Sequence, residues 1–247
     1  MSLPAIDPDR SALFLDVDGT LLDIVDHPAD VVADDQLVRN VLAAEKRLAG
    51  AIALISGRTL AELDRIFAPA SLPAAGTHGT EIRLPDGHIE HARTVPLDDD
   101  VVAMLKDVAD RHPGLLLELK DGGVALHYRR APQLETEARS AIDHALSAAG
   151  TDFRLIDGKM VLEIAPRAHH KGAALERFMR DPVYADRLPV FFGDDVTDED
   201  GFAAVNAMGG ISIKVGSLQG SAARHSVPDV AAVRRWLDSF GVARQSA

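Results

Sequence analysis

Carboxylate and hydroxyl side chains follow three short apolar segments of this sequence. Asp16 and Asp18 come directly after the first segment, Ser56 after the second, and Asp194 with Asp195 after the third. Carboxylates that converge on one point repel one another, and a hard divalent cation such as Mg²⁺ is the counter-ion that oxygen ligands favour. A carboxylate beside that cation could attack phosphorus. A second carboxyl two residues away could protonate the leaving oxygen and then deprotonate a water molecule. The pattern therefore predicts phosphoryl chemistry.

Lys171 lies at the predicted start of a helix and supplies a cation to the same set. Together with the Ser56 hydroxyl, its ammonium group could hold phosphoryl oxygens. Each piece alone is common: an Asp-x-Asp-Gly stretch is often only a turn, and an acidic run such as Asp198–Asp200 often only starts a helix. The joint order of these residues, each at the end of an element, favours function over coincidence.

The elements that position these residues alternate between strand and helix. Short apolar runs at 11–15, 51–55, 188–192 and 211–215 are typical of strands buried on both faces. Amphipathic helical patterns lie between them, and one begins with the capping box of Thr59 and Glu62. This order predicts an α/β fold with a doubly wound, Rossmann-like parallel sheet. Ligands of such sheets bind at the carboxyl ends of the strands, where the candidate residues lie.

The middle of the chain has a different pattern. Segments 115–120, 124–129 and 159–164 alternate between apolar and polar residues, as strands with one buried face do. We expect a small open-faced α+β domain, inserted at 95–166 and built around one amphipathic helix, within a core formed by 1–94 and 167–247. Its polar face would carry Glu118, Lys120, His127, Arg129, Lys159 and Glu163.

Composition excludes several function classes. The chain has 247 residues, a net charge of −12 and no cysteine. Such an acidic chain is poorly suited to nucleic acid or to an anionic membrane, and it has no thiolate metal site or cysteine nucleophile. Adjacent histidines on a loop rarely converge on one metal ion, so His169 and His170 predict no second metal site. With no basic leader at its start and no apolar run of ~18 residues, a cytoplasmic protein is expected.

Four motifs resemble those of the haloacid dehalogenase-like hydrolase superfamily. They are Asp16-Val17-Asp18-Gly19-Thr20, Ser56, Lys171, and Gly193-Asp194-Asp195 with Asp198. Within that superfamily the chain resembles the trehalose-6-phosphate phosphatases over about residues 12–240. The resemblance rests on Ile55-Ser56-Gly57-Arg58, Gly76-Thr77-His78-Gly79 with Glu81, residues 159–166, and residues 193–200.

The resemblance implies a role for each matching residue. Asp16 would be the nucleophile and Asp18 the general acid/base, while Ser56 and Lys171 would contact phosphate. Asp16, the Asp18 carbonyl and Asp194 would bind Mg²⁺, with Asp195 and Asp198 close by. Arg58 and His78 would contact substrate from the core. The inserted domain, called a cap in this family, would bind a disaccharide through Glu118, Lys120, Arg129, Lys159 and Glu163. We expect a monomer acting on a small sugar phosphate.

Two classes of alternative remain open at this point. Another sugar phosphate, such as sucrose phosphate or a glycosyl phosphoglycerate, or a phosphomutase reaction, would suit the same core. The mixture of Glu118 and Glu163 with cations favours a neutral disaccharide beyond the phosphate. A non-catalytic phospho-sensing module, comparable to receiver domains, is less favoured because it has no use for Asp18. Dehalogenase chemistry is disfavoured because a halide leaving group needs no acid.

Overall fold

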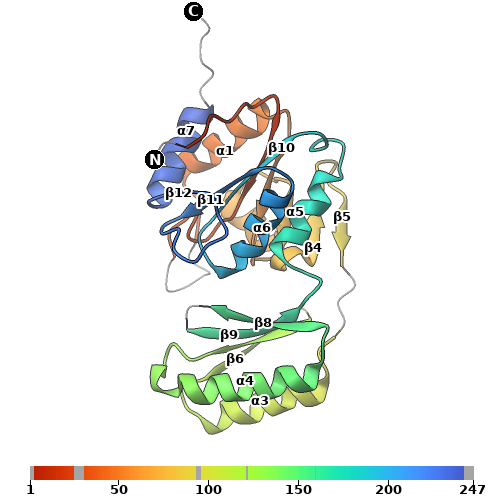
Figure 1. The fold of residues 1–247 in the computed structure, drawn as a ribbon, viewed down its shortest axis with the longest axis vertical. Coiled ribbons are helices and arrows are strands. Elements are labelled where there is room, and N and C mark those ends of the chain that lie inside the picture. The colour runs from red at the N-terminus through yellow and green to blue at the C-terminus, as the bar shows by residue number, and fades with distance from the viewer. Residues whose placement is uncertain (1–2, 25–30, 93–95, 121, 159, 242–247) are drawn as a thin grey trace, which may run out of the picture. The chain divides into compact units, whose positions relative to one another are not determined.

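The chain folds into two compact units, one formed by residues 1–91 with 170–247 and the other by residues 92–169. This computed structural model describes residues 3–24, 31–92, 96–120, 122–158 and 160–241 (Figure 1). Because both ends of the second unit's segment join the first unit, the second unit is an insertion in the chain. Across these described ranges, no helix is long and apolar enough to cross a membrane.

The first unit is built on one sheet of eight described strands in the order β12-β11-β10-β1-β2-β3-β4-β5. The strands are β1 (Ser11–Leu15), β2 (Ile52–Ile55), β3 (Ala74–Gly76), β4 (Glu81–Arg83), β5 (Ile89–His91), β10 (Leu188–Gly193), β11 (Ile211–Val215) and β12 (His225–Val227). Neighbours from β12 to β3 are parallel, whereas β4 and β5 extend the sheet antiparallel. The predicted α/β class is confirmed. The two antiparallel strands at one edge of the sheet were not indicated by the apolar pattern of the sequence.

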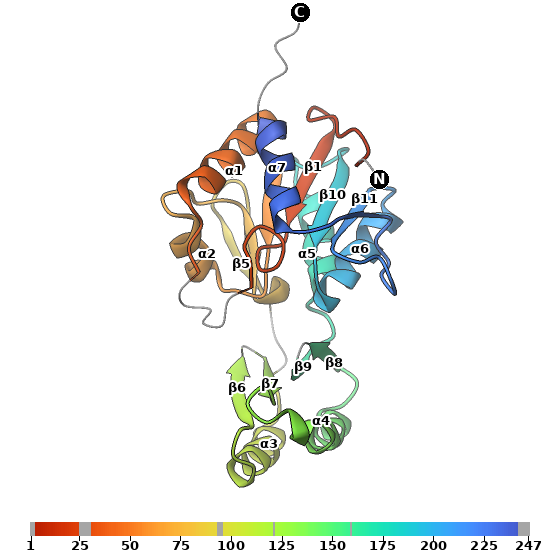
Figure 2. The ribbon, with the colours of Figure 1, turned by 90° about the vertical axis from the view of Figure 1, so that its left-hand side faces the viewer.

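Helices cover both faces of this sheet (Figure 2). They are α1 (Asp35–Arg47), α2 (Leu60–Phe67), α5 (Lys171–Met179), α6 (Glu199–Ala207) and α7 (Val230–Gly241). Helices α1 and α7 pack together on one face, and α5 and α6 pack together on the other. The capping box of Thr59 and Glu62 starts α2 as predicted.

The central strands are buried on both faces, which explains their uninterrupted apolar sequences. Every residue of β1 and of β2 is buried. Phe14 of β1 packs with Phe178 and Tyr184. Tyr184 is fully buried, and its hydroxyl donates a hydrogen bond of 2.8 Å to the carbonyl of Ile52 in β2. These contacts fix the strand that precedes Asp16.

The second unit is a four-stranded antiparallel sheet in the order β6-β7-β9-β8, with helices on one face (Figure 1). The elements are α3 (Asp99–Arg111), β6 (Leu116–Lys120), β7 (Gly123–His127), α4 (Glu135–Ala149), β8 (Phe153–Gly158) and β9 (Val161–Pro166). The register pairs Glu118 with Ala125 and Ala125 with Glu163, so all three share the face opposite the helices.

This unit differs from the sequence prediction in two respects. Both α3 and α4 pack on the sheet, where one helix was expected. Strand β8 was missed because its six residues, Phe-Arg-Leu-Ile-Asp-Gly, lack a strict alternation of apolar and polar residues. Its two buried side chains, Phe153 and Ile156, lie three residues apart, a spacing that resembles a helix more than a strand.

Candidate active site

The strand order of the first unit brings the predicted catalytic residues to one edge of the sheet. Strands β10, β1 and β2 are parallel neighbours, so Asp194, Asp16 and Ser56 follow carboxyl ends that meet at the same edge. The Asp16 N–H donates to the Phe192 carbonyl at 3.0 Å, which continues the ladder by one residue. The position of Asp16 is therefore fixed by its own backbone.

Lys171 reaches this edge from the first residue of α5. His170 caps the helix, because its Nδ1 accepts a hydrogen bond of 3.2 Å from the Ala173 N–H. The buried Lys171 ammonium group lies 2.8 Å from Asp16 Oδ1 and 2.7 Å from Asp198 Oδ1. Lys171 thus links carboxylates from two distant parts of the chain.

Asp198 organises the turn that carries Asp194. Its side chain is fully buried, and its Oδ2 accepts hydrogen bonds from the Asp194 N–H at 2.9 Å and the Asp195 N–H at 3.0 Å. A Cβ on Gly193 would lie 2.3 Å from the Asp198 carboxyl carbon, so only glycine allows this approach. One carboxylate therefore fixes both the lysine and the backbone of the acidic turn.

Asp16, Asp194 and Asp198 form an acidic cluster in which one oxygen from each lies within 4.8 Å of the others. Gly19 makes room for it, because a Cβ there would lie 2.0 Å from Asp194 Oδ2 and the backbone has a φ of +80°. The second Asp16 oxygen, Oδ2, is buried and has no hydrogen-bond partner. An unsatisfied buried carboxylate oxygen beside two further carboxylates is suited to a cation.

The electrostatics of the cluster follow from burial and crowding. Burial, together with the charges of Asp198 and Asp195, raises the pKa of Asp194 to about 7. Burial also raises the pKa of Asp16 well above its usual range, although the charge of Lys171 opposes this shift. Burial alone would lower the pKa of Lys171, but the charges of Asp16 and Asp198 outweigh it and raise that pKa.

Asp18 is held by Arg58 rather than by the acidic cluster. Arg58 Nε lies 2.6 Å from Asp18 Oδ2, and Arg58 Nη2 lies 2.6 Å from Asp18 Oδ1. The pairing is bidentate, and its hydrogen bonds to Asp18 raise the pKa of Arg58. Arg58, predicted as a substrate contact, is thus engaged with the predicted acid/base in this structure.

Ser56 and His78 lie in two turns that are joined by backbone hydrogen bonds. The Ser56 Oγ accepts from the Arg58 N–H at 3.1 Å, and the Ser56 carbonyl accepts from the His78 N–H at 3.0 Å. A Cβ on Gly57 would lie 2.8 Å from the His78 ring. Glu81 joins the same turns, since its Oε1 accepts from the Leu60 N–H at 2.7 Å.

The predicted sugar-binding residues lie in the second unit. Lys120 Nζ donates to the buried Glu163 at 2.5 Å, and His127 Nε2 lies 2.8 Å from Glu118 Oε2. Arg129 is exposed in the turn after β7. The structure therefore brings Glu118, Lys120, His127 and Glu163 onto one sheet face, whereas Lys159 lies outside the described residues.

Asp195 does not join the acidic cluster with its side chain. Its Oδ1 accepts from the Thr197 N–H and hydroxyl, both at 2.7 Å, and so caps the short turn that follows.

Two residues that support the site were not predicted from the sequence. His170 was considered only as a metal ligand, although it directly precedes a helix. Lys214 donates to the Asp195 carbonyl at 3.2 Å, and its only signal was a charge inside the apolar strand β11.

Solved structures of phosphatases share this fold. The Candida albicans trehalose-6-phosphate phosphatase C-terminal domain aligns with a TM-score of 0.82 at 24% identity, over 94% of this chain and 92% of that one. A phosphatase of the HAD enzyme superfamily from Bacteroides thetaiotaomicron aligns with a TM-score of 0.65 at 17% identity, over 98% of this chain and 99% of that one. The fold is that of the haloacid dehalogenase superfamily.

Sequence comparison narrows the class to one family. A family model described as trehalose-phosphatase matches residues 14–231. The Escherichia coli trehalose-6-phosphate phosphatase is 41% identical over 96% of this chain and 88% of its own length. A probable trehalose-phosphate phosphatase of Sinorhizobium fredii is 40% identical over 95% of this chain and 89% of its own length. The chain belongs to the trehalose-phosphatase family of phosphoric monoester hydrolases.

The support that Asp198 gives can be measured as stability. Asp198→Asn leaves one acceptor oxygen where the carboxylate accepts from Lys171 and two N–H groups, so we expect a loss of about 3 kcal/mol in the free energy of unfolding. Urea denaturation measures it. The control Asp195→Asn alters the exposed neighbour and should cost about 1 kcal/mol. Equal losses would show that Asp198 has no special structural role.

The raised pKa of Asp194 predicts a pH dependence of stability. Because its pKa is about 7 in the folded chain against an ordinary 3.8, the folded state holds this proton more tightly than the unfolded state. Stability therefore falls as pH rises from roughly 4 to 7. In metal-free buffer, the free energy of unfolding of the wild type should fall across this window by on the order of 2–4 kcal/mol relative to that of Asp194→Asn, as measured by urea denaturation. A difference that stays constant with pH would refute the assignment.

Proposed function

We propose that this protein hydrolyses trehalose 6-phosphate to trehalose and phosphate, through a phosphorylated Asp16 and with Mg²⁺ as cofactor. The observation that supports the mechanism is the state of the Asp16 carboxylate. One oxygen accepts from Lys171, and the other is buried with no hydrogen-bond partner. Two relatives support this choice of substrate: one from Escherichia coli is named a trehalose-6-phosphate phosphatase, and one from Sinorhizobium fredii a probable trehalose-phosphate phosphatase.

The acidic cluster has the donor set that a divalent cation needs. Asp16, Asp194 and the main-chain carbonyl of Asp18 would hold the ion, with Asp195 and Asp198 beside them. The unsatisfied Asp16 oxygen and the raised pKa of Asp194 both favour a bound positive charge. Bound there, Mg²⁺ would neutralise the carboxylates and polarise the phosphoryl group.

In the first step, the Asp16 carboxylate oxygen forms a bond to phosphorus while the bond from phosphorus to the sugar oxygen breaks. Asp18 gives its proton to that oxygen, so trehalose leaves as a neutral alcohol. In the second step, Asp18 takes a proton from water as the water oxygen attacks phosphorus, which frees Asp16 and phosphate. Ser56 and Lys171 hold the phosphoryl oxygens throughout. For Asp18 to act as the acid, its pairing with Arg58 must open.

We assign catalysis to the first unit and substrate selection to the second. Arg58 and His78 would contact substrate from the first unit. Glu118, Lys120, Arg129, Lys159 and Glu163 would contact the sugar from the second. Carboxylates and cations that alternate on one face can accept from and donate to neutral hydroxyl groups, whereas a second anionic group would need cations alone. The Lys120–Glu163 pair supplies one donor and one acceptor in a fixed position.

Phosphate release across a panel of sugar phosphates tests the function. Wild-type protein with Mg²⁺ should favour trehalose 6-phosphate over sucrose 6-phosphate and glucosyl phosphoglycerate, and removal of divalent cations by EDTA should abolish turnover. Asp16→Asn should lower kcat by about 1,000-fold or more, because the nucleophile is lost. The exposed Asp23→Asn is the control. Full activity in EDTA would exclude the metal, and an active Asp16→Asn would exclude the nucleophile.

Selectivity of the second unit needs a separate experiment. Glu163→Gln should lower kcat/KM for trehalose 6-phosphate by about 10- to 100-fold but leave a small aryl phosphate within about 3-fold, because only the disaccharide reaches the sugar-binding residues. Glu137→Gln, on the exposed side of α4, is the matched control. Equal losses on both substrates would give Glu163 a purely structural role.

A further inference from the structure

The guanidinium group of Arg58 has to leave Asp18 during the proposed reaction. It contacts both oxygens of that carboxylate, each at 2.6 Å, so neither oxygen is available to a leaving group or to a water molecule. Arg58 is only 9% exposed, and a buried cation that loses its anionic partner is strongly destabilised. Opening the pair therefore requires a second anion within reach of Arg58.

The carboxylate of Glu62 lies within that reach. Its Oε1 is 3.9 Å from Arg58 Nη1. Asp18 contacts Nε and Nη2, so Nη1 is the corner of the guanidinium group that Asp18 does not contact. The hydrogen bonds to Asp18 raise the pKa of Arg58 most strongly, and the charge of Glu62 raises it further. Glu62 therefore already acts on the guanidinium group in this structure.

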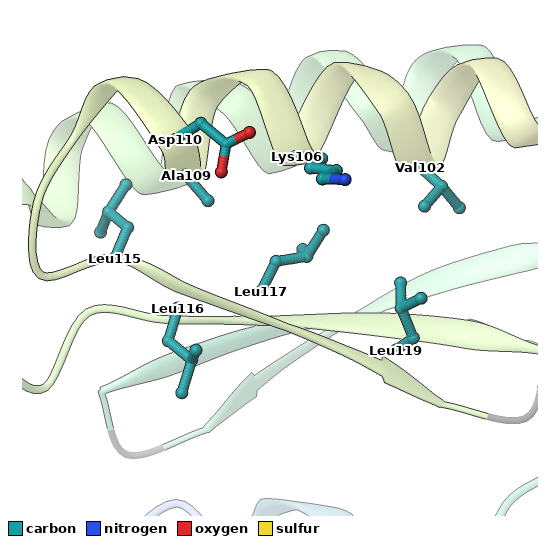
Figure 3. Close-up of a pocket in the computed structure, with 8 residues that line it drawn as sticks. All are labelled: Val102, Lys106, Ala109, Asp110, Leu115, Leu116, Leu117 and Leu119. Carbon is teal, nitrogen blue, oxygen red and sulfur yellow. The ribbon is translucent and has the colours of Figure 1, made fainter.

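The capping box at the start of α2 positions this carboxylate. Glu62 Oε2 accepts from the Thr59 N–H at 2.9 Å and from the Thr59 hydroxyl at 2.8 Å. The other oxygen, Oε1, takes no part in the cap and lies beside Arg58. Spacing alone does not produce such a contact. Lys106 and Asp110 of α3 are also four residues apart in the sequence, but their charged ends lie apart in Figure 3.

The backbone of Arg58 is fixed, so only its side chain needs to move. Its N–H donates to Ser56 Oγ at 3.1 Å, and its carbonyl accepts from the Thr77 N–H at 2.9 Å. A shift of about 1 Å would bring Nη1 from its present distance to hydrogen-bond distance of the second carboxylate. Rotation about the bonds of the arginine side chain is enough for such a shift.

We propose that Glu62 is a positioning residue that receives Arg58 when substrate binds and so releases Asp18. In the paired state, Arg58 contacts Asp18, as it does in this structure. In the exchanged state, Arg58 contacts Glu62 and the substrate, and Asp18 is available as acid and base. One cation between two carboxylates is a two-state element whose populations the substrate shifts. The inference rests on the proposed function, because the need to release Asp18 follows from its assigned role.

Removing the charge of Glu62 tests this exchange. Glu62→Gln keeps an oxygen that can accept from Thr59, so the cap and the stability should persist. It removes the negative charge that attracts Arg58, so fewer enzyme–substrate complexes should reach the exchanged state. We expect kcat for trehalose 6-phosphate to fall about 3- to 5-fold, which matches the energy of a partly exposed ion pair. KM should stay within about 2-fold of the wild-type value, because the substrate still binds.

Glu176→Gln is the matched control. Glu176 of α5 also lies four residues from an arginine, with its Oε2 3.8 Å from Arg180 Nη2, and its replacement should leave kcat unchanged. Urea denaturation should give both variants the wild-type midpoint. A Glu62→Gln variant with the wild-type kcat would overturn the proposal. A loss of kcat together with a lowered midpoint would also overturn it, because Glu62 would then have a purely structural role.

A double-mutant cycle tests whether Glu62 acts through Arg58. Arg58→Met has no guanidinium group to exchange, so adding Glu62→Gln to this variant should not lower kcat further. An effect of the same size as in the wild-type background would refute the proposal. The same assay distinguishes the two levels of inference. A wild type that releases no phosphate from trehalose 6-phosphate would refute the proposed function and this exchange with it, whereas an active wild type that does not depend on Glu62 would refute the exchange alone.

Discussion

The buried pairing of Lys171 with Asp16 and Asp198 is the interaction on which the catalytic edge depends. The ammonium group contacts both carboxylates at under 3 Å, in a place with almost no solvent. Removing water from these charges is costly, so the arrangement persists only because each ion has several partners. Asp198 meets this condition through two backbone N–H groups, and Lys171 through two carboxylates. Asp16 alone keeps an unsatisfied oxygen, at the position where chemistry is proposed.

The order of the strands in the sheet explains why a few residues are enough to form the catalytic edge. Four adjacent parallel strands, β10, β1, β2 and β3, end at one edge, and each contributes a short turn there. The turns are then joined by backbone hydrogen bonds and by tight approaches that only glycine permits, at Gly19 and Gly193. Rigid strands and compact turns hold functional groups more accurately than long loops do, because little conformational entropy remains to be lost when substrate binds.

Sequence patterns predicted the core of this architecture well because its strands are fully buried. The apolar runs before Asp16, Ser56 and Asp194 had no competing interpretation, and their parallel order placed the three residues at one edge. Three strands were not predicted: β4 and β5 have only three residues each, and β8 lacks a regular alternation of apolar and polar residues. The Arg58–Asp18 pair and the capping role of Asp195 were also beyond reach, because side-chain partners depend on turn geometry that spacing alone does not specify.

The pairing of β1 with β10 has a consequence for biosynthesis. Ser11 lies opposite Leu188, so the strand that bears Asp16 acquires this neighbour only after three quarters of the chain has been made. Closing so long a loop slows folding and keeps an apolar strand exposed on the ribosome. The same order means that a prematurely terminated polypeptide lacking α5 and β10 has no assembled reaction centre, so incomplete products cannot consume phosphate esters.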